Sequence, residues 1–149
     1  MRIGPTVYLA LLVSMPYSGA FAAPADCAAN FAKPDKGHGL LGVLAPTTVS
    51  YQSHALIQGV SQKDAFTRAY RAIIADGFSV TQSDRDVGAI SAEATGNGGA
   101  NHVILSFLID AQPNGLDLSV KISASAGGMG HPEKHVCGPI LAAAGEIAP

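Results

Sequence analysis

The chain alternates hydrophobic and polar residues with a period of two in four stretches, the pattern of strands with one buried face. The most regular is "LDLSVKISA", in which Leu118, Val120 and Ile122 are expected to face inward and Ser119 and Lys121 outward. The four strands predicted in this way cover residues 47–58, 78–82, 87–94 and 116–124.

A fifth stretch, "HVILSFLID" at residues 102–110, is more hydrophobic than the others. Every second residue from Val103 to Ile109 is apolar, and Ile104 and Leu108 on the opposite face are apolar as well. Two hydrophobic faces are typical of a strand that is covered on both sides. We therefore expect this stretch to be a central strand with both faces buried.

Short polar segments between these stretches predict turns. Asp and Ser side chains bond their own backbone in turns, so "SDRD" at residues 83–86 is the expected connection of one hairpin. "QPNG" is expected to close the second hairpin, because Asn114 and Gly115 tolerate positive backbone angles. The glycine-rich "TGNGGAN" and "SAGGMG" lack the Lys-Ser/Thr ending of a phosphate loop and are predicted to be connectors.

One segment, residues 61–77, repeats its hydrophobic residues with helical spacing. Ser61 followed three residues later by Asp64 is an N-terminal capping signature. Gly77 is expected to end the helix in the left-handed conformation, with Phe78 packing back onto the last turn. The predicted buried stripe of this helix is Phe66, Ala69, Tyr70, Ile73 and Gly77.

A second helix is predicted near the C-terminus, with Pro132 in its first turn. Gly138 and Pro139 interrupt the pattern, so this helix is expected to be short or kinked. The element order is then β-α-β-β-β-β-α. Because neither the helices nor the sheet can bury an apolar face alone, the predicted fold class is α+β: a two-layer sandwich, mainly antiparallel, with the main helix packed on one face.

The N-terminus has the features of a secretory signal peptide. Arg2 precedes a short apolar run, and Ala20 and Ala22 satisfy the small-x-small rule, which predicts cleavage after Ala22. An uncleaved anchor and a lipoprotein acylated at Cys27 are the alternatives, and Asp26 before that cysteine argues against the second. The predicted organisation is a signal peptide at 1–22, an extended Ala/Gly/Pro-rich arm at 23–46 and one domain at 47–149.

Composition then restricts the class of function. Of 149 residues, loss of 22 leaves 127, enough for one domain, with eight Lys and Arg against eleven Asp and Glu. The resulting charge of −3 has no basic stripe, so we expect no nucleic-acid partner, and no later segment is long enough to span a membrane. Cys27 and Cys137 are expected to form a disulfide in an oxidising compartment, the alternatives being two free thiols or an intermolecular bridge.

Two histidines are the strongest chemical candidates. His131 and His135 lie four residues apart in a predicted helix, and Cys137 could add a sulfur ligand for zinc or copper. Against a metal site, Cys137 has a partner in Cys27 and Pro132 can keep His131 outside the helix, so exposed surface histidines are the preferred interpretation. No cofactor is predicted.

Catalysis is not expected from the sequence. No G-x-S-x-G elbow is present, and the serines fall on predicted strand faces. Asp84 and Asp86 could form a carboxylate pair, but with Arg85 between them in a tight turn they are expected to be solvated.

The stretch "GFSVTQSDRDVGAISA", in this order of elements, resembles the repeated domain of bacterial envelope lipoproteins of the BamC type. The matching positions are Gly77, Phe78, Val80, Asp84, Arg85, Gly88 and Ile90. The resemblance implies an envelope accessory or adaptor domain without catalysis. The chain departs from that pattern because it lacks a lipobox and a second copy of the domain.

These observations together predict an exported, non-catalytic binding or accessory module in the periplasm or outside the cell. Its expected partner is another envelope or secreted protein, met by strand addition at an exposed sheet edge and by the glycine loops. The alternative is a small periplasmic metal-binding protein that uses His131 and His135.

Overall fold

The computed structural model describes residues 26–32, 48–95, 102–125 and 129–147. The predicted signal peptide and most of the predicted arm lie outside these residues. The elements in chain order are β1 (Thr48–Ile57), α1 (Gln62–Ala75), β2 (Ser79–Asp84), β3 (Ala89–Thr95), β4 (His102–Gln112), β5 (Gly115–Ser125) and α2 (Pro132–Ala144). The predicted α+β class and the order β-α-β-β-β-β-α are confirmed.

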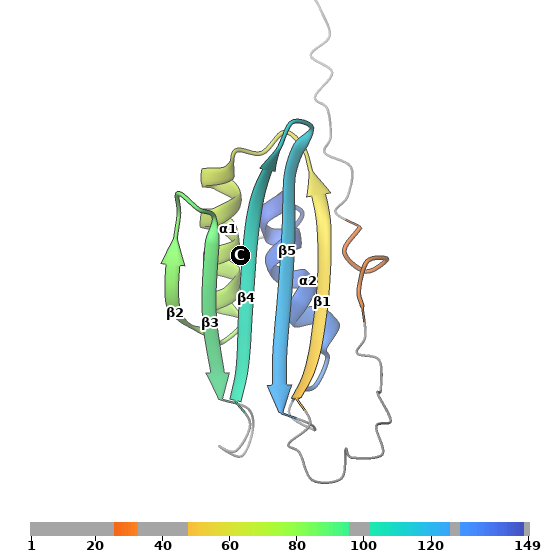
Figure 1. The fold of residues 1–149 in the computed structure, drawn as a ribbon, viewed down its shortest axis with the longest axis vertical. Coiled ribbons are helices and arrows are strands. Elements are labelled where there is room, and N and C mark those ends of the chain that lie inside the picture. Colours follow the sequence, from red (N-terminus) through yellow and green to blue (C-terminus); the bar gives the residue numbers. More distant parts are fainter. Residues whose placement is uncertain (1–25, 33–47, 96–101, 126–128, 148–149) are drawn as a thin grey trace, which may run out of the picture.

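The five strands form one antiparallel sheet in the order β1-β5-β4-β3-β2. Strands β2 to β5 follow one another across the sheet, and β1 pairs with β5 at the far side. Both helices lie on the same face, as Figure 1 shows, with α2 packed on β1 and β5 and α1 on β2 and β4. The described residues therefore form two layers, and neither of their helices lies on the other face of the sheet.

The core lies between the sheet and the helices. Alternate residues of the long central strands are buried there, including Leu105 and Phe107 of β4 and Leu118 of β5. On the other face of β4, Ile104 is 46% exposed and Leu108 is 44% exposed. β4 is the central strand, as expected, but the prediction that both its faces are covered is wrong, because the two helices lie on the same face.

Helix α1 begins and ends as its sequence predicts. The Ser61 hydroxyl accepts the backbone N–H of Asp64 at 3.1 Å and donates to the Asp64 carboxylate at 2.8 Å. At the other end Gly77 has φ +91°, and the N–H of Phe78 donates to the carbonyl of Ile73 at 3.2 Å. This is the left-handed helix stop that was expected, and it places the Phe78 side chain in the core.

The sequence predicts a short or kinked second helix. Helix α2 continues through Gly138 and Pro139 over 13 residues, so it is not shortened there, and the kink stays a prediction. Pro139 has no N–H to donate to the carbonyl four residues earlier, which costs a helix interior about 3 kcal/mol. It is fully buried, and so are Ile140 and Ala143 in the same helix. We attribute the continuity of α2 to this burial against α1 and the sheet.

The hairpin turns differ in detail from the predicted ones. The β2–β3 connection is residues 85–88 rather than 83–86. Asp84 ends β2, and its carboxylate accepts the backbone N–H groups of Asp86 and Val87, both at 3.0 Å. In the β4–β5 turn only Gly115 has a positive φ, at +150°. The predicted carboxylate pair is exposed, and Asp84 uses its carboxylate to hold the turn.

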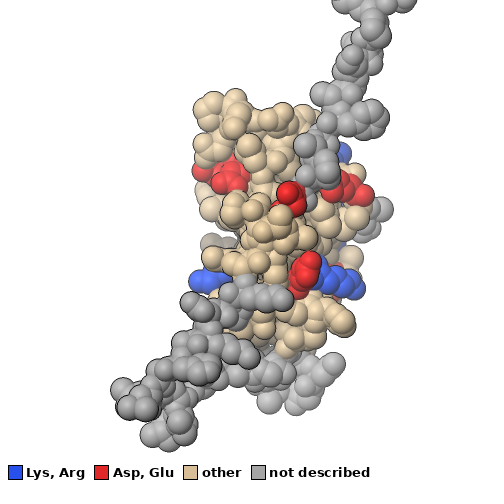
Figure 2. All heavy atoms as spheres, turned by 90° about the vertical axis from the view of Figure 1, so that its right-hand side faces the viewer, with Lys and Arg blue, Asp and Glu red and all other residues tan. Residues whose placement is uncertain are grey.

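Charged residues are sparse on the β1 side of the molecule. Figure 2 shows basic and acidic side chains there, some next to each other, among mostly uncharged residues. The described residues visible on this side form no basic stripe. Among the described residues, no helix is long and apolar enough to cross a membrane.

Candidate functional site

The predicted disulfide between Cys27 and Cys137 is present. It joins residues 110 positions apart with their Cα atoms 5.7 Å from each other, and neither cysteine is free. Cys27 is 1% exposed and Cys137 is 7% exposed. The bond therefore attaches the segment before β1 directly to α2 inside the core.

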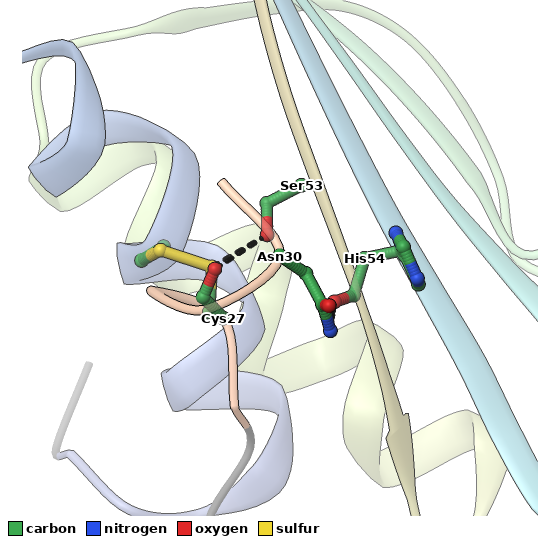
Figure 3. The surroundings of a disulfide bond; sticks show 5 residues. Cys27, Asn30, Ser53 and His54 are labelled. Carbon is green, nitrogen blue, oxygen red and sulfur yellow. Dashed lines mark hydrogen bonds between the residues drawn. A yellow bond between two sulfur atoms is a disulfide. The ribbon is translucent and has the colours of Figure 1, made fainter. Parts of the chain in front are cut away.

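The disulfide holds residues 27–32 along the outer edge of β1 (Figure 3). Ala32 and Gln52 exchange backbone hydrogen bonds of 2.8 and 3.4 Å, and the Asn30 side-chain amide donates to the carbonyl of His54 at 3.1 Å. The buried Ser53 hydroxyl donates to the carbonyl of Cys27 at 2.7 Å. The middle of this sheet edge is thus already paired with the chain itself.

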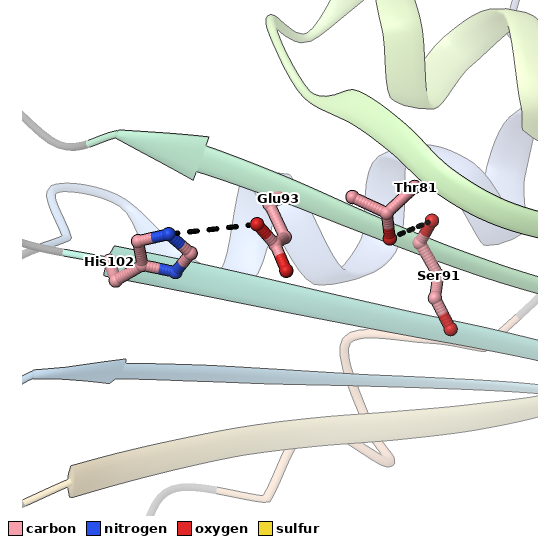
Figure 4. A network of polar contacts seen from close by, with 4 residues as sticks. All are labelled: Thr81, Ser91, Glu93 and His102. Carbon is pink, nitrogen blue, oxygen red and sulfur yellow. Dashed lines mark hydrogen bonds and ion pairs between the residues drawn. The ribbon is translucent and has the colours of Figure 1, made fainter.

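The opposite edge of the sheet, β2, is different. Within the described ranges no segment pairs with its outer side, and five of its six residues are exposed. A bulge between Val80 and Gln82 interrupts its pairing with β3, and the Thr81 hydroxyl donates to the carbonyl of Ser91 at 3.2 Å (Figure 4). β2 is therefore an edge strand with unpaired backbone groups available to solvent.

The uncovered face of the sheet carries polar residues together with the exposed side chains of Ile104 and Leu108. One row across four strands consists of Gln52, Lys121, Ser106 and Ser91. A hollow of about 620 Å³ lies over this region and is bounded at β1 by Asn30 and Ala32. His102, the first residue of β4, and Glu93 of β3 pair at 3.6 Å on the surface (Figure 4). Such an exposed pair contributes at most about 1 kcal/mol to stability.

The two candidate metal ligands do not converge. The Nδ1 of His135 pairs with the Asp76 carboxylate at the end of α1, and the His135 ring lies edge-on to Phe78 with the ring centroids 6.0 Å apart. His131 precedes α2 in a left-handed conformation with φ 54° and is exposed. Across the described parts of the chain, no group of three or more His, Cys, Asp or Glu side chains could hold a metal ion.

The interpretation of both histidines as exposed holds for His131 and is wrong for His135, which is half-buried. Its partner Asp76 lies 59 residues earlier in the chain. No local spacing links the two, so the pair was missed at the sequence level. The structure gives His135 a structural role, joining the C-terminal end of α1 to α2.

No protein-family model matches this chain, and no curated protein sequence is significantly similar to it. The resemblance to BamC-type domains therefore stays a prediction. The residues on which it rests have structural roles here: Gly77 and Phe78 form the exit from α1, and Asp84 and Gly88 form the turn after β2.

Proposed function

We propose that this protein is an extracytoplasmic, non-catalytic binding module that receives an extended segment of a protein partner at β2, by strand addition. The observation that carries the proposal is the difference between the two sheet edges. The middle of β1 is paired with residues 27–32, whereas no described segment pairs with the outer side of β2.

The compartment is inferred from the covalent chemistry together with the N-terminal sequence. Disulfides persist in oxidising compartments, and Cys27–Cys137 is buried and ties two elements of the core together. Residues 1–22 have the pattern of a secretory signal. Both features favour a periplasmic or secreted protein.

The absence of catalysis is inferred from the roles of the reactive side chains. Both thiols are consumed by the disulfide, and His135 is held by Asp76. Asp84 holds the β2–β3 turn through two backbone N–H groups. These groups support the fold. We therefore infer that the protein binds its partner through the backbone of β2 and not through a reactive side chain.

Strand addition supplies affinity through backbone hydrogen bonds and specificity through alternate side chains. β2 suits it because the strand is six residues long, exposed, and adjacent to a helix rather than buried beneath one. Natural proteins protect such edges with charge, proline or a bulge. β2 has no proline and no charge before Asp84, its last residue, and its bulge is confined to the step between Val80 and Gln82.

The proposal is tested by panning a random dodecapeptide phage library against the immobilised, disulfide-bonded protein, followed by synthesis of the recovered peptides. Methylation of successive backbone amides should weaken binding at every second position, because only alternate N–H groups of an added strand face β2. Amide hydrogen exchange should slow at residues 79–84 and stay unchanged at Gln52. Failure to recover any peptide, or protection confined to the uncovered sheet face, would refute strand addition at β2.

A further inference from the structure

A groove runs between α1 and the helix-facing side of β2. It encloses about 410 Å³. The bulge in β2 turns Ser83 toward this groove, since Ser83 lies opposite the buried Ile90 of β3. The residues that line the groove are Phe66, Thr67, Tyr70, Arg71, Ser83 and Arg85. An extended segment added to β2 would pass along this groove, with every second side chain pointing into it.

The two arginines of the groove have different surroundings, and neither pairs with an acidic side chain of the described residues. The guanidinium of Arg85 lies 5.6 Å from the centroid of the Phe66 ring, and that ring stacks on Tyr70 at 6.2 Å. Arg71 is exposed on α1. Within the described parts of the chain, neither guanidinium forms an ion pair with a carboxylate.

Three acidic residues near the arginines in sequence have partners: Asp64 bonds with Ser61 at the start of α1, Asp76 pairs with His135, and Asp84 accepts two backbone N–H groups in the turn. The Asp86 side chain, next to Arg85 in the chain, is exposed and forms no ion pair with Arg85. Lys63, Thr67 and Arg71 follow one another at a spacing of four residues, which places them in one row along α1. The flank of α1 beside β2 is therefore basic, in a chain whose net charge is −2.

We infer that this groove binds the carboxylate of an Asp or Glu side chain in the added peptide, with Arg71 and Arg85 as the binding residues. Stacking on an aromatic ring preorganises a guanidinium while leaving its N–H groups to bond a carboxylate in a bidentate fashion. The Ser83 and Tyr70 hydroxyls around it can donate further hydrogen bonds, whereas the Thr67 hydroxyl already donates to the carbonyl of Lys63 at 2.8 Å. This inference rests on the proposed strand addition and names the partner as an acidic extended segment.

The experiment repeats the dodecapeptide panning on the disulfide-bonded protein and on two variants. The test variant is Arg71→Gln with Arg85→Gln, and the control is Lys121→Gln, which removes a positive charge from the uncovered sheet face. Peptides recovered on the wild type and on the control should be enriched in Asp or Glu. Peptides recovered on the test variant should not.

Affinity then distinguishes the sources of the carboxylate. Replacing the acidic residue of a recovered peptide with Asn or Gln should weaken binding about tenfold or more, since hydrogen bonds to charged groups are worth about 1.5 kcal/mol or more. Amidation of the peptide C-terminus should leave binding unchanged. Sensitivity to amidation alone would overturn the inference in favour of a terminal carboxylate.

The possible results distinguish a failure of carboxylate binding in the groove from a failure of strand addition at β2. Recovery of peptides without acidic enrichment overturns the arginine groove and leaves strand addition standing. Recovery of no peptide at all refutes both. Because Arg85 packs on Phe66, its loss can destabilise the protein, so Arg71→Gln alone serves as a second variant. An unchanged affinity for acidic peptides in that variant, with an unchanged Tm, would also overturn the role of Arg71.

Discussion

Removal of the Cys27–Cys137 disulfide by the double substitution Cys27→Ala and Cys137→Ala should destabilise the fold strongly. The bond closes a loop across 110 residues. In the chain-entropy description such a loop restricts the unfolded chain by about 5 kcal/mol at 25 °C. Since domains have a total stability of about 5–15 kcal/mol, the variant would lose about a third of it or more. For a chain of this size, Tm should fall by roughly 15–25 °C.

The assay is urea unfolding followed by circular dichroism, with the reduced wild type as the control that keeps both sulfurs and loses only the bond. The reduced protein and the variant should lose similar free energies of unfolding. Amide exchange at Gln52 should also accelerate, because its backbone bonds to Ala32 depend on the tether. A loss below about 2 kcal/mol in both proteins would refute the reasoning from loop closure.

Three further predictions concern packing and backbone. Phe107, 2% exposed, and Leu108, 44% exposed, are neighbours on opposite faces of β4. Phe107→Ala should lower the free energy of unfolding in urea by about 3–5 kcal/mol, and Leu108→Ala by about 1 kcal/mol or less. Equal losses would contradict a sheet with one buried face. In Gly115→Ala the new Cβ would lie 2.2 Å from the backbone oxygen of Ile57 in β1, whereas in Gly77→Ala no neighbouring heavy atom lies within 4 Å of the new Cβ. Gly115→Ala should therefore lower Tm more than Gly77→Ala. Similar shifts in Tm would show that the β4–β5 turn relaxes freely. Ser61→Ala should cost about 1 kcal/mol, and Ser61→Asp should recover most of it; an unchanged stability in both variants would mean that the cap contributes nothing.

Much of the fold follows from local pattern. The cap at Ser61 and the stop at Gly77 depend on residues within a few positions of each other, so sequence alone places both ends of α1. The alternation in β5 is unbroken, and every second residue from Leu116 to Ala124 is buried as expected. Local spacing also predicts the order of elements and hence the class.

The predictions that fail depend on where distant segments pack. Ile104 and Leu108 look like residues of a doubly covered strand, but only the positions of the two helices decide whether a second cover exists. Pro139 was expected to shorten or kink α2, but the helix continues through it, and its burial is set by α1 and the sheet. The pair of His135 with Asp76 is likewise formed between helices that are far apart in the chain.

The sequence predicts the type of the candidate site, an exposed sheet edge, but not its location in the fold. An exposed sheet edge was expected, but which edge is bare depends on the pairing of Ala32 with Gln52, for which the sequence carries no signal. The groove at α1 likewise depends on the β2 bulge. The bulge interrupts the alternation of side chains along β2 and so turns Ser83 toward α1. The proposed role of Arg85 in binding a carboxylate rests on its position over the Phe66 ring, which the sequence does not predict.

The unequal edges of the sheet also limit how copies of this protein can assemble. Growth of a continuous fibre through edge-to-edge contacts needs two bare edges per molecule, one to give and one to receive. With the middle of β1 occupied by the chain's own residues 27–32, self-association through β2 would stop at a closed pair. The tether that stabilises the fold would in this way also protect the protein against polymerisation at high concentration.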